Sequence, residues 1–215
     1  MGGSMSDKRE ELLLRMYDQM FNDINRHILV VWQSIGTLVG ACAAFTLVEK
    51  QLLTLDIATC IIVLLCCWLL AHLHDAAYWY NRNLAIAANI ERQFLRKEDL
   101  REVHYYFGRH RPKNRMLTHL RIQYGFGIVL AGVVLGHHGC EQAVPAFVAG
   151  TEGLSLSVWC PYVLAVVCTV LLAVLKSHRN ASYAEFLLNS PGRLVDTEGI
   201  VYGVGHGFRA GDQDK

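Results

Sequence analysis

Two histidines and an aspartate, His72, His74 and Asp75, are the residues whose types and spacing come closest to a chemical site. Imidazole and carboxylate groups bind metals and transfer protons. Two histidines separated by one residue point about 200° apart on a helix, which suits a single metal only if a second helix contributes. The sequence also lacks an H-E-x-x-H pattern. We therefore expect no metal, no cofactor and no enzymatic activity, and predict that these residues act at the mouth or gate of a pore.

A second group of candidate residues interleaves positive charge with aromatic rings. Arginines and stacking rings bind phosphates and bases, so this segment is a predicted nucleotide-binding site. The alternative is contact with anionic lipid, which the same basic composition also favours. The sequence leaves both interpretations open. The predicted ligand-binding residues are Arg101, Tyr105, Tyr106, Arg109, Arg111, Lys113 and Arg115.

The composition places these groups in a membrane protein. The chain has 215 residues, of which 53% are hydrophobic, and the apolar residues come in blocks. Each block is long enough to be interpreted as a membrane span, the third only if residues 117–123 also enter the interface. The sequence therefore predicts an all-α membrane protein with four transmembrane helices in two hairpins. The predicted spans are Ile28–Val48, Ile57–Leu73, Ile122–Leu135 and Val158–Leu175.

Small and polar residues inside the spans indicate how the helices meet. Glycines four residues apart let helices approach closely in lipid, which predicts helix packing at Gly36, Gly40, Gly132 and Gly136. Gln33 and Thr37 lie beside the first pair of glycines. They are interpreted either as interhelical hydrogen-bonding groups or as the lining of a pore.

The second span has a continuation that organises the rest of the chain. Residues Ile57–Phe94 contain no glycine or proline and are predicted to form one helix about 57 Å long, which exceeds a hydrocarbon core of about 30 Å. Beyond the span, apolar residues recur at helical spacing and must pack against another helix. The expected partner is the amphipathic segment Asp7–Arg26 or its copy in a neighbouring subunit. The recurring positions are Trp79, Asn83, Ile86, Ile90 and Phe94.

The distribution of charge predicts the topology. Of the 20 lysines and arginines, only Lys50 lies between spans one and two, and none lies between spans three and four. By the positive-inside rule, both termini and the central segment are cytoplasmic. The expected organisation is a cloning remnant (1–4), a cytoplasmic amphipathic helix (5–27), hairpin one (28–81), a basic cytoplasmic helical segment (82–121), hairpin two (122–175) and a cytoplasmic helix with a tail (176–215).

The residues at the opposite ends of the spans are expected to be mainly structural. Asp56 begins span two and is interpreted as a helix cap. The segment His137–Ser157 is expected to be a loop, flanked by Cys140 and Cys160, which could pair if it faces an oxidising periplasm. The other cysteines are interpreted as apolar filling.

This layout resembles the SLATT family of bacterial antiphage effectors, in which a two-helix membrane hairpin continues into cytoplasmic helices. The resemblance is architectural and covers roughly Asp7–Leu188. Four spans in place of two depart from the family pattern, and no functional residue is carried over. The resemblance implies a homo-oligomer, expected to be a tetramer, in the bacterial inner membrane.

The resemblance also implies a function. Hailong-type channel effectors, which are gated by oligodeoxyadenylate, are the most similar because of the basic segment. The expected function is an ion channel that depolarises an infected cell when it binds an oligonucleotide second messenger from a partner nucleotidyltransferase. The alternative is a membrane scaffold that anchors a cytoplasmic nucleic-acid-binding partner, similar to the four-span component of Kiwa systems. A third alternative, an integral-membrane enzyme, would depend on His72 or His74.

Overall fold

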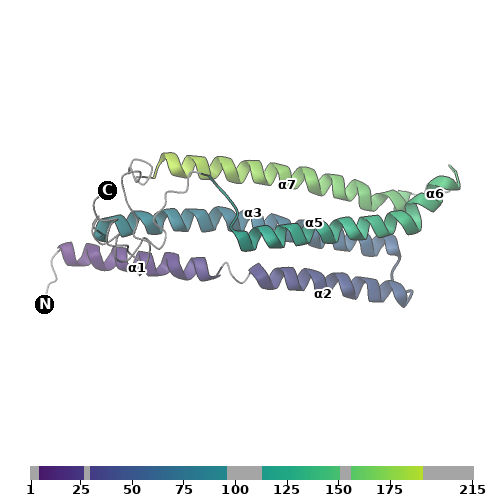
Figure 1. Cartoon of the computed structure of the whole chain (residues 1–215), viewed down its shortest axis with the longest axis horizontal. Coiled ribbons are helices and arrows are strands. Elements are labelled where there is room, and N and C mark those ends of the chain that lie inside the picture. The colour runs from purple at the N-terminus through teal and green to yellow at the C-terminus, as the bar shows by residue number, and fades with distance from the viewer. Residues whose placement is uncertain (1–4, 27–29, 96–112, 151–155, 191–215) are drawn as a thin grey trace, which may run out of the picture. The chain divides into compact units, whose positions relative to one another are not determined.

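The computed structural model describes residues 5–26, 30–95, 113–150 and 156–190, and this part of the chain contains helices and no strand (Figure 1). Its elements are α1 (Met5–Arg26), α2 (Val30–Glu49), α3 (Leu55–Phe94), α5 (Thr118–His138), the π-helix η2 (Gly139–Ala143), α6 (Val144–Val148) and α7 (Leu156–Leu188). The prediction of an all-α protein is therefore confirmed for the described residues.

The helices divide into two compact units. Unit 1 comprises residues 1–26, 79–114 and 182–215, and unit 2 comprises residues 27–78 and 115–181. The sequence predicted segment boundaries after residues 27, 81, 121 and 175. In the structure the chain passes from one unit to the other after residues 26, 78, 114 and 181. Both α3 and α7 contribute residues to each unit.

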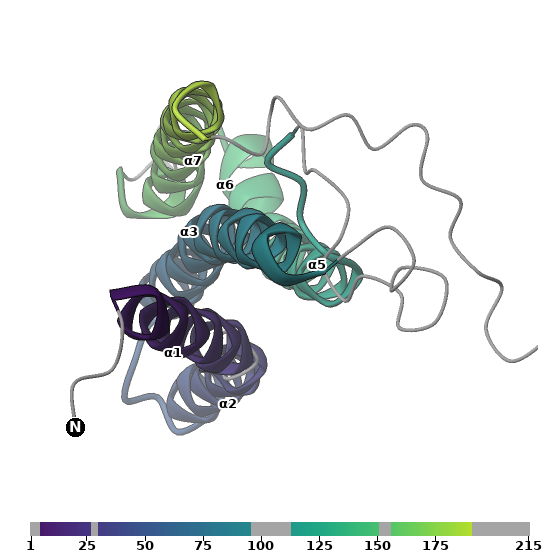
Figure 2. The same cartoon turned by 90° about the vertical axis from the view of Figure 1, so that its left-hand side faces the viewer.

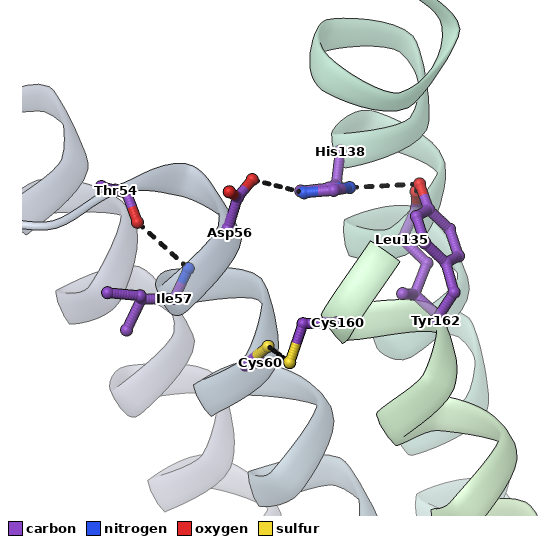
Figure 3. Close-up of polar contacts among 8 residues, drawn as sticks. All are labelled: Thr54, Asp56, Ile57, Cys60, Leu135, His138, Cys160 and Tyr162. Carbon is purple, nitrogen blue, oxygen red and sulfur yellow. Dashed lines mark hydrogen bonds and ion pairs between the residues drawn. The ribbon is translucent and has the colours of Figure 1, made fainter. Parts of the chain in front are cut away.

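The long helix predicted from Ile57 to Phe94 is confirmed. α3 has 40 residues without a break, which corresponds to about 60 Å. The Thr54 hydroxyl accepts a hydrogen bond from the backbone N–H of Ile57 at 3.4 Å, so Thr54 provides the side-chain cap at the start of α3 (Figure 3). The absence of glycine and proline between residues 55 and 94 explains why the helix does not end at the last residue of its apolar part.

Within unit 2, α3 packs against α2, α5 and α7 (Figure 2). One apolar cluster joins α2, α3 and α5, and it consists of Ala41, Ala44, Ala58, Ile62, Cys66 and Val134. A second joins α3 and α5 and is covered in part by Leu172 of α7; it consists of Leu69, Leu70, Leu73, Ala76, Ala77 and Leu120. The core of unit 2 is therefore built around the apolar half of α3.

Three helical stretches in the described part of the chain are long and apolar enough to cross a membrane: Leu55–Phe94, Thr118–Val148 and Leu156–Leu188. Their outward sides carry exposed valines and isoleucines, for example Val129 on α5 and Val166 on α7. Such continuous apolar surface is typical of a protein that lies in lipid. These features identify an integral membrane protein.

Unit 1 packs α1 against the C-terminal part of α3, as predicted for the amphipathic segment. The contact consists of Ile24, Leu84, Ala87 and Ala88, with Tyr17, Met20 and Tyr80 beside them. The expected stripe was wrong in detail, because Trp79 and Phe94 remain exposed. The small side chains of Ala87, which lies beside the expected stripe, and of Ala88 leave room for α1 on this face of α3.

The loop predicted over His137–Ser157 is also partly wrong. α5 continues to His138 and is followed by the π-helix and by α6, which reaches Val148. At its other end α5 begins at Thr118, four residues before the predicted start of the third span. Only part of the expected loop remains, because helical backbone bonds continue through Gly139.

Glycines on α5 face two different environments. A Cβ added at Gly127 would lie 3.1 Å from Leu70 Cδ2, inside the core of unit 2, whereas one added at Gly132 or Gly136 would meet nothing within 4 Å. On α2, a Cβ at Gly40 would lie 2.9 Å from Leu65 Cδ1, and one at Gly36 would meet nothing. Gly40 and Gly127 therefore allow close contact with α3, and the other three glycines are uncovered within the described chain.

We expect Gly127→Leu to destabilise the protein by about 1–3 kcal/mol, because the added side chain overpacks against Leu69 and Leu70. Gly125→Leu is the matched control on the same helix, since an added Cβ there meets nothing within 4 Å and the gain in helix propensity is the same. Thermal unfolding in detergent would measure both variants. Equal melting temperatures for the two would contradict the packing described here.

Candidate functional site

The predicted gate residues lie in three different environments. His72 is exposed, and its ring packs edge-to-face on Trp68 with centroids 4.6 Å apart. His74 is buried and packs on Tyr124 in the same way at 5.3 Å. Asp75 forms an ion pair with Arg179 of α7. Because these environments differ, the three side chains do not form a single site.

The ion pair of Asp75 links α3 to α7 immediately after the apolar part of α3. Both partners are partly exposed, and the Arg179 guanidinium also lies over the ring of Tyr78, 5.1 Å from its centroid. A partly buried pair with a cation–π contact holds its geometry better than a free surface pair. Arg179 was not among the predicted site residues, although it is the group that neutralises Asp75.

On α2, Ser34 and Thr37 are buried and Gln33 is half-buried, and the hydrogen-bonding groups of these residues are only partly satisfied. The Thr37 hydroxyl donates to the backbone carbonyl of Gln33 at 3.0 Å. Within the described part of the chain, no hydrogen-bond partner is found for Gln33 Oε1 or for Ser34 Oγ. A polar atom without a partner is costly away from water, so these atoms require water or a second protein surface.

Most of the predicted nucleotide-binding residues lie outside the described part of the chain. These are Arg101, Tyr105, Tyr106, Arg109 and Arg111. Lys113 and Arg115 are described, and both side chains are exposed. Their positive charge is therefore accessible to solvent.

Asp56, His138 and Tyr162 form a hydrogen-bonded chain that sequence reasoning did not predict (Figure 3). His138 is fully buried, at 0% exposure, and its Nε2 lies 2.9 Å from Asp56 Oδ1. On the other side of the ring, Nδ1 lies 3.1 Å from the Tyr162 hydroxyl, which is also 3.3 Å from the backbone carbonyl of Leu135. The chain therefore connects α3, α5 and α7.

This chain of hydrogen bonds keeps the two contacts of His138 whether or not the imidazole carries an additional proton. With a neutral imidazole, Nε2–H donates to the Asp56 carboxylate and Nδ1 accepts the Tyr162 proton. With a protonated imidazole, both ring nitrogens donate, and the Tyr162 hydroxyl turns its proton to the Leu135 carbonyl. Both states keep the contacts of His138 with Asp56 and Tyr162, and only the protonated state keeps the hydrogen bond from Tyr162 to the Leu135 carbonyl. The network therefore suits a structural tie or a proton-holding site.

Local sequence explains how these three side chains meet. Gly139 follows His138, and a Cβ added there would lie 3.2 Å from the Tyr162 hydroxyl, so glycine makes room for the phenol. The interpretation of Asp56 as a helix cap is corrected: Thr54 supplies the side-chain cap, and Asp56 pairs with His138.

One signal in the sequence could have revealed the network. Asp56 begins the second predicted span, His138 follows the third, and Tyr162 lies near the start of the fourth. In neighbouring antiparallel helices these positions lie at the same depth in the membrane, so their polar side chains can reach one another.

Two cysteines lie beside this network. The Cys60 and Cys160 sulfur atoms are 3.8 Å apart, on α3 and α7 (Figure 3). Both are free thiols, as is Cys140, which the sequence had suggested as the partner of Cys160. The structure thus brings Cys160 close to a different cysteine. No cluster of metal-binding residues occurs among the described residues.

Comparison with known protein families, with curated proteins and with solved structures finds no match to this chain. Functional inference therefore depends on the geometry above.

We expect His138→Ala to destabilise the protein by about 1–3 kcal/mol, because Asp56 then loses its buried partner. The double variant Asp56→Ala/His138→Ala should lose less than the sum of the two single variants, because they act on one interaction. His137→Ala is the control, since His137 is exposed. Thermal unfolding in detergent is the measurement, and equal effects of His137→Ala and His138→Ala would contradict the network.

We also expect mild oxidation to join Cys60 and Cys160. Two thiols lose two protons and two electrons to the added oxidant, and the sulfur atoms approach from 3.8 Å to about 2.05 Å. Peptide mass spectrometry after thiol labelling would detect the linked peptides. Cys140→Ser should leave the link intact and Cys60→Ser should abolish it; a link between Cys140 and Cys160 would contradict the expectation.

Proposed function

We propose that this protein is a homo-oligomeric membrane channel, an antiphage effector that opens when a nucleotide or oligonucleotide binds its cytoplasmic part. In this proposal α2 (Val30–Glu49) is a fourth span, both termini are cytoplasmic, and the membrane is the bacterial inner membrane. Between Val30 and Val48 this helix carries no charged residue, and Trp32 and Val39 are among its exposed apolar side chains.

The observation that carries the proposal is the unbroken course of α3 through both units. Its apolar half forms the core of unit 2, and its polar half is buried in unit 1 against α1. In unit 1 the Tyr17 hydroxyl donates to Glu91 at 3.2 Å, so the polar half of α3 is held specifically. A change at one end of a continuous helix has a rigid path to the other.

Pore lining is assigned to the polar face of α2. Gln33 Oε1 and Ser34 Oγ are buried and have no partner within the described chain, so the proposal requires that the open channel exposes both atoms to water. The uncovered glycines Gly132 and Gly136 on α5 suit close contact with a second copy. Together these features support an assembly of several chains.

The gate is assigned to the ion pair between Asp75 and Arg179. This ion pair joins α3 and α7, both of which contribute residues to the two units. It lies where the apolar part of α3 ends. Ligand binding at the basic segment, including Lys113 and Arg115, would favour one of two arrangements of α3.

A scaffold that anchors a cytoplasmic partner is the second candidate. The observation that favours it is on α1, where Leu12 is 58% exposed and Leu14 and Met16 are also exposed. This apolar surface would suit a partner protein or a copy of unit 1.

The test is an ion-flux measurement on the full-length protein in liposomes, with and without oligodeoxyadenylate. We expect ligand-dependent flux, and we expect Lys113→Gln/Arg115→Gln to weaken the response to ligand. Lys50→Gln is the charge-matched control, because Lys50 lies between the first two spans, away from the basic segment. The absence of flux from a correctly assembled oligomer would reject the channel and leave the scaffold.

A further inference from the structure

A cavity of about 310 Å³ lies within unit 2 between α3, α5 and α7. Most of its wall is apolar, and Leu70 and Leu172 are typical lining residues. Its polar groups are unevenly distributed, because the residues with cationic, imidazole or phenol side chains lie at one end of the cavity. These residues are His74, Tyr124 and Lys176.

The cavity has the length of one bilayer leaflet. Each of the three helices contributes lining residues over eleven residue steps: 63–74 on α3, 124–135 on α5 and 165–176 on α7. At 1.5 Å per residue this corresponds to about 16 Å, close to half of a hydrocarbon core of about 30 Å. α3 and α7 run in one direction and α5 in the other, so the polar residues mark one end and Val63, Leu135 and Ala165 the other (Figure 1).

The polar end contains a buried histidine without a hydrogen-bond partner. His74 is 8% exposed, and no hydrogen bond to its ring nitrogens is found in the described part of the chain. Its contact with Tyr124 is edge-to-face at 5.3 Å, which leaves the nitrogens available to a ligand. Lys176 lines the same end and contributes an amine side chain.

We propose that this cavity binds one acyl chain of an anionic phospholipid, with the lipid phosphate held by Lys176 and His74. A narrow apolar space of leaflet length fits a linear hydrocarbon chain. A lysine and a hydrogen-bonding imidazole at its polar end fit a phosphate and favour a lipid with net negative charge. In the expected orientation this end lies at the cytoplasmic leaflet, where anionic lipids concentrate.

The inference depends on membrane insertion and does not depend on gating. The purified full-length protein would be exchanged into mixed micelles containing equal amounts of phosphatidylglycerol and phosphatidylcholine with the same acyl chains. Native mass spectrometry then counts the lipids that remain bound per protomer. We expect one retained lipid, with phosphatidylglycerol preferred.

Two variants, each with a matched control, distinguish lipid bound in the cavity from lipid bound elsewhere on the protein surface. Ala173→Trp places an indole in the cavity and should abolish retention, whereas Val174→Trp, at the next position, which does not line the cavity, should not. Lys176→Gln should reduce the preference for phosphatidylglycerol about fivefold. Lys50→Gln, an exposed lysine that does not line the cavity, should leave the preference unchanged.

Equal retention by Ala173→Trp and Val174→Trp would overturn the proposal, because the lipid would then be bound elsewhere. Equal binding of the two lipids by the unmodified protein would also overturn it. If Ala173→Trp fails to assemble, Thr169→Phe fills the cavity one turn deeper and decides the same question. Ion flux without lipid retention would reject this site and leave the channel unaffected.

Discussion

One unbroken helix that has to satisfy two environments is the constraint on which the rest of this structure depends. The backbone of α3 bonds within itself, so the helix can pass from lipid to water without a free polar group. Its side chains then need different partners along its length. Where the helix is apolar, Gly127 lets α5 approach Leu70 closely. Where it becomes polar, α1 covers Ala87 and Ala88. The other long helices that the structure describes pack around α3.

Apolar helices in lipid can slide past one another with little cost, because their surfaces are alike. Two polar contacts oppose such sliding, at either end of the apolar part of α3: the bond between Asp56 and His138, and the ion pair between Asp75 and Arg179. A polar group has few acceptable partners in a bilayer, so each contact defines one register. The network at His138 also tolerates a change of protonation, which keeps the register intact when a proton arrives.

The sequence was sufficient to predict most of the helices and insufficient to predict their polar contacts. The continuity of α3 followed from the absence of glycine and proline, and the partnership of α1 followed from its periodicity. The helical continuation after His138 was missed because glycines normally suggest a loop, yet here Gly139 accommodates Tyr162. Pairs such as Asp75 and Arg179 were missed because they are about a hundred residues apart in the chain, and periodicity carries no information on long-range contacts.

The two sides of α5 differ in what a mutation would cost. At Gly127 a single added methyl group would already press against the core, so folding alone selects for glycine there. At Gly132 and Gly136 an added Cβ would lie within 4 Å of no atom of the described chain. Since alanine is the better helix former, each of these glycines weakens the isolated helix by about 1 kcal/mol relative to alanine. Within the described chain no packing contact at either glycine offsets that loss.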